Sequence, residues 1–194
     1  RRTGAGRETA ENIHGSEAGS DFEASLDQLE AELPNVSRVN LVVAWFGSDL
    51  RCGECEIRPG VEIAGKTTVP QAWSVAGIGR GDAYVVSQTG GKPNYGGTPS
   101  DESVRQAVAA LKARGWHVTL YPFLLMDVPA GNGLPDPLGD EEQPAFPWRG
   151  RLTTVAGDAV EQIETFFESY RDFVLHYAGL AEESGADGVL IGSE

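Results

Sequence analysis

Apolar runs and helical apolar periodicities alternate along the chain from residue 21 onward. The first periodicity, in residues 21–33, recurs every three or four positions and predicts a helix that ends at Pro34. The run VNLVVAWF at 39–46 follows, and it is almost unbroken and rich in β-branched residues. Continuous rather than alternating hydrophobicity is typical of a strand buried on both faces, as in a parallel sheet.

The alternation continues through the middle of the chain. A short apolar run at 83–87 predicts a strand, and residues 98–115 predict a second helix. Thr98 can cap this helix, Pro99 suits its first position, and Gly115 can end it. The run WHVTLYPFLLMD at 116–127 then predicts a buried strand, followed by a loop rich in proline and glycine.

Residues 158–184 predict a long helix with a wide apolar face. A strict alternation of three and four residues is compatible with a coiled coil, but the aromatic-rich face favours a helix lying on a sheet. A turn and a short apolar strand at 188–191 follow. The main stripe comprises Val160, Ile163, Phe167, Tyr170, Val174, Tyr177 and Ala181, widened by Phe166, Phe173 and Leu180.

The order of elements predicts a parallel α/β fold. Strands alternating with helices form either a doubly wound sheet or a (β/α)8 barrel. About four strands are present, half of what a closed barrel needs. We therefore expect residues 21–194 to form roughly the first half of a TIM barrel that continues beyond the chain. Residues 1–20, rich in Gly, Ser, Glu and Arg, predict a flexible arm or linker.

Composition narrows the function classes. The formal net charge is −14, which disfavours nucleic acid and anionic membrane surfaces as partners, because both are bound through Lys and Arg. No apolar run is long enough to span a bilayer. The glycines of 77–81 partly mimic a dinucleotide loop without a following helix, and the histidines lack metal or triad spacing. The sequence thus predicts no cofactor and no metal, and a neutral substrate such as a glycan is compatible with its charge.

The segment LRCGECEIRPG at 50–60 contains both cysteines of the chain, Cys52 and Cys55. A redox pair should open a helix, whose N-terminus lowers the thiol pKa, yet Pro59-Gly60 follows and no helical periodicity appears. Zinc needs four ligands, and no second pair with suitable spacing is present. Free thiols packed in the loop and a local disulfide both remain open.

Four stretches carry a resemblance to a known family. LVVAWFGSDLRCGECEIRPGVE, YGGTPSDESVRQAVAALKARGWHV, PFLLMDVPAGNGLPDP and QPAFPWRGRLT resemble the TIM-barrel-like domain, described as glycoside-hydrolase-like, of the baseplate hub protein of gene transfer agents and related phages. The resemblance covers residues 21–194. It implies a place in the tail of a virion or gene-transfer-agent particle assembled in the bacterial cytoplasm. It also implies two kinds of partner: other tail or baseplate proteins, and a polysaccharide of the host envelope.

A second resemblance concerns the final strand. WRG, the long helix and a strand ending in IGSE are similar to a clan of retaining glycosidases with (β/α)8 barrels. This similarity implies that Glu194 serves as the general acid/base, although Ser193 stands where the clan commonly has asparagine. The nucleophile of such barrels comes from a later strand. Within this chain, Asp127 is the best candidate for a second acidic group that contacts the substrate, and the alternative is a loop hydrogen-bond acceptor.

Aromatic and planar polar side chains suggest where a sugar would bind. Trp45 ends the first strand, and Trp148 and Arg149 lie in a loop expected on the same face, with Trp73 and Tyr95 nearby. Loop packing or a partner subunit would also explain exposed tryptophans. Two functions follow: a glycosidase, or a non-catalytic structural or carbohydrate-binding tail module. The motifs disfavour a third, an unrelated cytoplasmic α/β enzyme.

Overall fold

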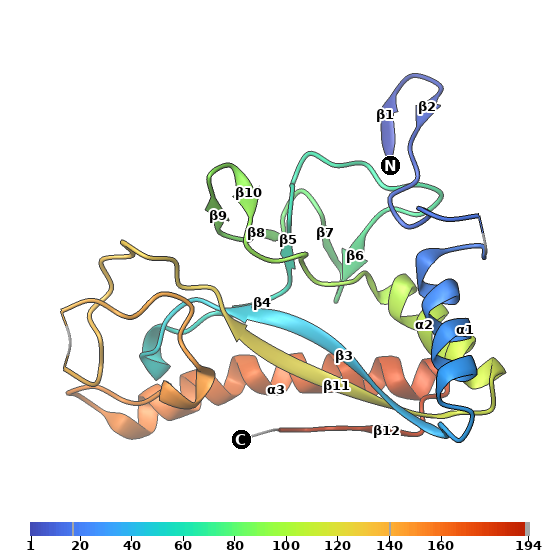
Figure 1. The fold of residues 1–194 in the computed structure, drawn as a ribbon. Coiled ribbons are helices and arrows are strands. Elements are labelled where there is room, and N and C mark those ends of the chain that lie inside the picture. Colours follow the sequence, from blue (N-terminus) through green and yellow to red (C-terminus); the bar gives the residue numbers. More distant parts are fainter. Residues whose placement is uncertain (17, 140, 193–194) are drawn as a thin grey trace.

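The computed structural model describes residues 1–16, 18–139 and 141–192. Two ten-residue strands, β3 (Arg38–Gly47) and β11 (His117–Met126), pair in parallel along their whole length (Figure 1). The short strand β12 (Gly188–Val189) extends the sheet in parallel beside β11. The antiparallel β4 (Ile57–Arg58) lies on the other edge, giving the order β12-β11-β3-β4. The predicted parallel α/β organisation is confirmed, and the curled sheet is consistent with a partial barrel.

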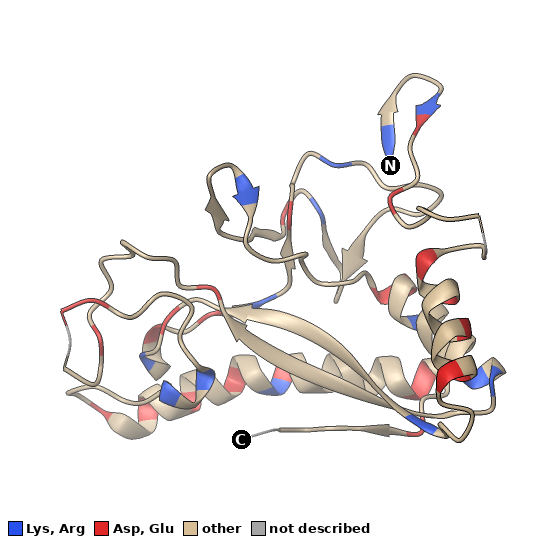
Figure 2. Cartoon of the chain, viewed as in Figure 1, with Lys and Arg blue, Asp and Glu red and all other residues tan. Residues whose placement is uncertain are grey.

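Only one face of the central sheet is buried along its full length. Val43 and Trp45 of β3 and alternate residues of β11 from Val118 to Met126 pack against the helices. The other face would line the interior of a closed barrel, and on it Val42 is 54% exposed. The prediction of strands buried on both faces is therefore wrong for this part of the sheet. Figure 2 shows that β3 and β11 carry no charge except Arg38, at the beginning of β3.

Helix α1 (Asp21–Glu32) precedes the sheet, and α2 (Asp101–Ala113) connects its two long strands. The cap of α2 is Ser100, whose hydroxyl accepts from the amide of Ser103 over 3.2 Å. The predicted cap, Thr98, instead accepts from Gly60 N and donates to the carbonyl of Ala44, joining the loop to β3. The end of α2 is as predicted, because Gly115 has a φ of 76°.

Helix α3 (Ala159–Ser184) begins at the Asp158 cap and ends at Gly185, which is left-handed. It runs along one face of the sheet, as predicted for a helix on a sheet (Figure 1). Its buried residues are Phe166, Phe173, Tyr177, Leu180 and Ala181. The predicted main stripe is thus wrong in the first half of the helix. In this half, the buried residue is Phe166, which belongs to the row beside the predicted stripe, whereas Val160, Ile163 and Phe167 are exposed.

Short strand pairs fill the long connection between β3 and α2. Strands β5 (Gly60–Val61) and β8 (Tyr84–Val85) pair in parallel, outside the main sheet. The strand expected at 83–87 is thereby reduced to β8. Two antiparallel hairpins accompany them: β6 (Ser74–Val75) with β7 (Ile78–Gly79), and β9 (Gln88–Thr89) with β10 (Lys92–Pro93).

The N-terminal arm folds onto this connection. It forms a hairpin of β1 (Arg2–Gly4) and β2 (Arg7–Glu8), and Arg2 N donates to Thr67 O over 2.9 Å. Two 3-10 turns complete the fold: η1 (Cys52–Glu54) and η2 (Arg149–Arg151). Among the described residues, no helix has both the length and the hydrophobicity required to cross a membrane.

Candidate functional site

Strands β3 and β11 end side by side at Gly47 and Met126, and the parallel β12 runs toward the same edge of the sheet, where barrel enzymes place their active sites. We call this edge, with the loops above it, the mouth. The predicted acid/base Glu194, with Ser193 before it, lies outside the described residues. The chain that leads to it is described as far as Gly192, which borders a groove together with Arg149. The role of Glu194 stays a prediction.

Asp127 ends β11 and is 4% exposed. Its Oδ2 accepts from the Tyr84 hydroxyl and from Ser87 N, both over 2.7 Å, and its Oδ1 accepts from Ser87 Oγ over 2.5 Å. Asn94 Nδ2 donates to the same Ser87 hydroxyl over 2.7 Å. The carboxylate therefore fastens the first long loop to the end of β11. This geometry is that of the loop hydrogen-bond acceptor, the alternative to a sugar contact.

An aromatic cluster covers the inner face of the sheet beneath this loop. The ring of Phe46 lies 6.2 Å from that of Tyr84 and 5.2 Å from that of Tyr95. Tyr95 also donates to the carbonyl of Met126 over 3.3 Å. Burial and the neighbouring Asp127 raise the pKa of Tyr84, whose ring lies 4.2 Å below the Arg58 guanidinium. Tyr84 thus stays a neutral hydrogen-bond donor at physiological pH.

Trp45 does not reach the mouth, and its predicted contact with substrate is wrong. It is 6% exposed and belongs to the core between β3 and α3. Its indole nitrogen donates to the Tyr177 hydroxyl over 3.0 Å, and its ring lies 5.1 Å from that of Phe173. The reason is the alternation of side chains along a strand, which turns Phe46 to the inner face and Trp45 to the helices. Trp73 is also buried, and its indole nitrogen donates to Thr98 O over 2.8 Å.

Trp148 and Arg149 lie where η2 begins. The Trp148 ring, 57% exposed, covers Gly150 so closely that a Cβ there would lie 2.4 Å from it. The Arg149 guanidinium lies 4.1 Å from the centroid of Phe123, on the inner face of β11. The structure thus brings Arg149 to the inner face of the sheet near the mouth. That Trp148 and Arg149 contact substrate stays a prediction.

The groove beside Arg149 has a volume of about 480 Å³. Its floor is formed by Pro122 and Leu124 of β11 and by aromatic residues of α3. Tyr170 of α3 donates to the carbonyl of Ile191 over 3.2 Å, which fixes the path of the chain after β12. The lining is Pro122, Leu124, Arg149, Gly150, Leu152, Phe166, Phe167, Tyr170, Ile191 and Gly192.

A buried glutamine, which the sequence analysis did not single out, holds the proline-rich loop to the first long loop. Gln143 Oε1 accepts from Leu50 N over 2.9 Å, and its Nε2 donates to Asp49 Oδ1 over 2.7 Å and to Pro135 O over 3.1 Å. Asp49 is in turn paired with Arg51, with 2.6 Å between Oδ2 and the guanidinium. This buried polar network fixes two of the loops of the mouth relative to each other.

The cysteine pair is part of the core. Cys52 and Cys55 are buried free thiols, and η1 is a single 3-10 turn rather than the start of an α-helix. Burial raises the pKa of both thiols, that of Cys55 to about 11. Within the described ranges, no group of three or more metal-ligating side chains occurs. The geometry supports packed thiols rather than a nucleophile or a zinc site.

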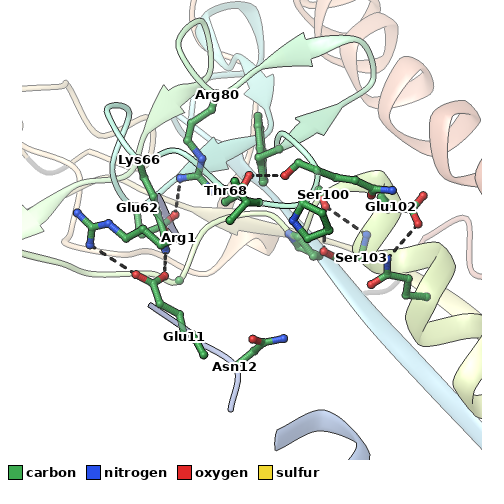
Figure 3. Close-up of a pocket in the computed structure, with 18 of the residues that line it drawn as sticks. Arg1, Glu11, Asn12, Glu62, Lys66, Thr68, Arg80, Ser100, Glu102 and Ser103 are labelled. Carbon is green, nitrogen blue, oxygen red and sulfur yellow. Dashed lines mark hydrogen bonds and ion pairs between the residues drawn. The ribbon is translucent and has the colours of Figure 1, made fainter. Parts of the chain in front are cut away.

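A second cavity of about 620 Å³ lies between the N-terminal arm, the connection before β6 and the start of α2 (Figure 3). An alternating chain of charges runs along one side of it, from Glu11 through Lys66 and Glu62 to Arg80. The sequence pointed to none of these residues as a group, because they come together only when the arm folds back.

Comparisons with known proteins support the fold. No protein-family model and no curated protein matches the chain. Two solved structures of a GH113 β-1,4-mannanase, one described as a complex, superpose with TM-scores of 0.51 and 0.50 at 15% identity. The match covers 90% of this chain but only 40% of the mannanase chain. At this identity the likeness shows the fold alone, that of a glycoside-hydrolase-like partial barrel.

Proposed function

We propose that this chain is the first part of a glycoside-hydrolase-like barrel that binds and hydrolyses a cell-surface or cell-wall polysaccharide, with Glu194 as the acid/base. The observation that carries the proposal is the superposition of 90% of the chain on a mannanase fold. Strand β12 is parallel to β11 and runs toward the edge where β11 ends, and the proposal places the carboxylate of Glu194 at that edge. A carboxylate in this position suits a general acid.

The described residues assign supporting roles around that carboxylate. Arg149 offers a planar cation on the inner face, suited to sugar hydroxyls. Asp127 positions the loop of Tyr84 and Ser87 rather than reacting itself, because both of its oxygens accept from that loop. A retaining mechanism needs a second carboxylate about 5–5.5 Å from the first. In this proposal, a later strand of the barrel supplies it.

Exposed apolar residues fit a barrel that continues beyond this unit. Val42 lies uncovered on the inner face of the sheet, and Phe167 and Ile191 lie uncovered beside the groove. Further strand and helix units would bury all three in a closed barrel. The sequence resemblance adds the biological setting, a phage-tail or gene-transfer-agent baseplate whose other proteins are the partners of this domain.

The test compares hydrolysis by the full-length protein with that by its Glu194→Gln variant. We expect the wild type to release reducing sugar from at least one glycan in a panel of bacterial envelope polysaccharides and β-1,4-mannan. The variant should lose this activity, whereas Glu182→Gln, an exposed glutamate of α3, should keep it. Equal inactivity of wild type and Glu194→Gln on every glycan would contradict the catalytic proposal.

The occupied carboxylate of Asp127 favours a second candidate, a non-catalytic carbohydrate-binding or structural tail module. With Asp127 committed to the loop, the predicted site residues of this chain offer only Glu194 for acid–base chemistry. Binding of a glycan without release of reducing sugar, unchanged in Glu194→Gln, would identify this second function.

A further inference from the structure

The cavity beneath the N-terminal arm is built from three segments distant in sequence. In Figure 3, the ion-paired side chains Glu62 and Lys66 lie on one side of it, and the hydroxyls of Ser100 and Ser103 lie on the other. Glu11 of the arm closes the lower side through its ion pair with Lys66. This cavity shares no lining residue with the groove of Arg149.

Its charges are of both signs, with four acidic and three basic side chains. The acidic side chains of Glu8, Glu11, Glu62 and Glu102 face the basic ones of Arg1, Lys66 and Arg80. Lys66 bonds both Glu11 and Glu62, and Glu62 also accepts from Arg80 over 3.0 Å. Because most of these charges are paired with one another and only one acidic side chain is in excess, the lining favours neither a multiply charged anion nor a multiply charged cation. A neutral ligand rich in hydroxyl groups fits this lining best.

The cavity also holds planar, fixed hydrogen-bonding groups. The Arg80 guanidinium lies 5.5 Å from the ring of buried Trp73, and one of its nitrogens donates to the carbonyl of Ile63 over 3.0 Å. Its Nε is buried, and no hydrogen-bond partner for it occurs among the described residues. The guanidinium of Arg80 is held in a fixed orientation by its contacts with Glu62, Ile63 and Trp73. Gln106, exposed on α2, adds an amide at the rim.

We infer that this cavity is an accessory binding site for a short neutral oligosaccharide, walled on one side by the folded arm. The substrate class rests on the proposed function, but the site shares no lining residue with the groove of Arg149. A volume of about 620 Å³ accommodates a few sugar rings. The site would hold a stretch of polysaccharide beside the mouth, which raises the local concentration of chain there.

The test maps binding residue by residue with ¹H–¹⁵N NMR. β-1,4-Mannotetraose, cellotetraose and, as an anionic counter-probe, tri-galacturonic acid are titrated into the protein. We expect saturable shifts of the Trp73 indole and of the Ser103 and Gln106 amides with a neutral probe. Arg80→Lys keeps the positive charge but removes the planar guanidinium with its several N–H donors. This variant should bind the neutral probe at least tenfold more weakly. Arg105→Lys, at a partly exposed arginine of α2 that pairs with Glu183 and does not line the cavity, is the control and should leave this binding unchanged.

The outcomes separate this inference from the proposed function. Shifts confined to the mouth, at Tyr95 and Trp148, would overturn the accessory site while leaving the proposed function in place. No saturable shift at either site with any neutral probe would overturn the inference and count against the proposed substrate class as well. Binding of tri-galacturonic acid alone at the cavity would overturn the neutral ligand. Equal weakening in Arg80→Lys and Arg105→Lys would also overturn it, because the effect would not come from the Arg80 guanidinium.

Discussion

Replacing Asp127 with alanine should destabilise the fold before it affects any chemistry. The substitution removes the acceptor for three donors: the Tyr84 hydroxyl, Ser87 N and Ser87 Oγ. A hydrogen bond to a charged group contributes about 1.5–3 kcal/mol, so the three together set an upper limit of about 9 kcal/mol. The two hydroxyls are only partly buried and can turn to water. We therefore expect a loss of about 3–5 kcal/mol in the free energy of unfolding.

Urea denaturation followed by circular dichroism measures this loss, and a double-mutant cycle assigns it. Tyr84→Phe removes one of the three bonds and should cost about 1–2 kcal/mol alone. In the Asp127→Ala background it should cost much less, giving a coupling of about 1 kcal/mol. Asp82→Ala, an exposed aspartate of the same connection, is the control and should change stability by at most about 0.5 kcal/mol.

Two results would refute this reasoning. A loss below about 1 kcal/mol for Asp127→Ala would mean that the loop does not depend on the carboxylate. Unchanged stability together with lost glycan binding would instead make Asp127 a direct sugar contact, the role predicted from the sequence. The experiment thus decides between the two roles considered for this residue.

Three further outcomes test an exposed ion pair near the N-terminal arm and the packing of the core. The hydrogen bond to Asp21 raises the pKa of the His14 imidazole. The charged contact is therefore present while His14 is protonated and is lost as pH rises through the raised pKa. An NMR titration of His14 should show a lower pKa in Asp21→Asn than in the wild type. Burial raises the pKa of Cys55 to about 11, so the folded state loses stability as pH rises above the ordinary thiol pKa. At pH 8, a thiol reagent should label Cys55 only after unfolding. Rapid labelling of the folded protein would contradict this. Trp45→Phe removes a buried hydrogen bond and ring contacts, and it should lower the free energy of unfolding in urea by about 1–3 kcal/mol. The control Trp148→Phe, at an exposed residue, should lower it by about 0.5 kcal/mol or less.

Local patterns were enough to predict the main elements. The apolar runs at 39–46 and 116–127 became β3 and β11, and the periodic segments became α1, α2 and α3. Periodicity records which residues avoid water, and this is a property of each segment. The same patterns predicted the cap of α2 two residues early. Thr98 and Ser100 are both capping types, and only the hydrogen bonds of Thr98 to β3 and its loop decide between them.

The candidate site depended on information that the sequence does not hold locally. The residues that point to either face of β3 are mostly apolar. The run VNLVVAWF therefore does not tell whether Trp45 or Phe46 lies on the inner face of the sheet. Asp127 could be placed at the end of its strand, but its partners Tyr84 and Ser87 lie 43 and 40 residues away. No spacing rule connects residues at such separations.

The sequence by itself determined the order of the strands and helices, the acidic charge and the short list of residues able to meet a sugar. Tertiary structure alone decided where each of these residues lies. It turned Trp45 into the core, committed Asp127 to a loop, brought Arg149 to the inner face and folded the arm over a cavity. The physical reason is that secondary structure follows from neighbours along the chain. A site, by contrast, is assembled by long-range hydrogen bonds and packing, whose partners are chosen only as the whole chain closes on itself.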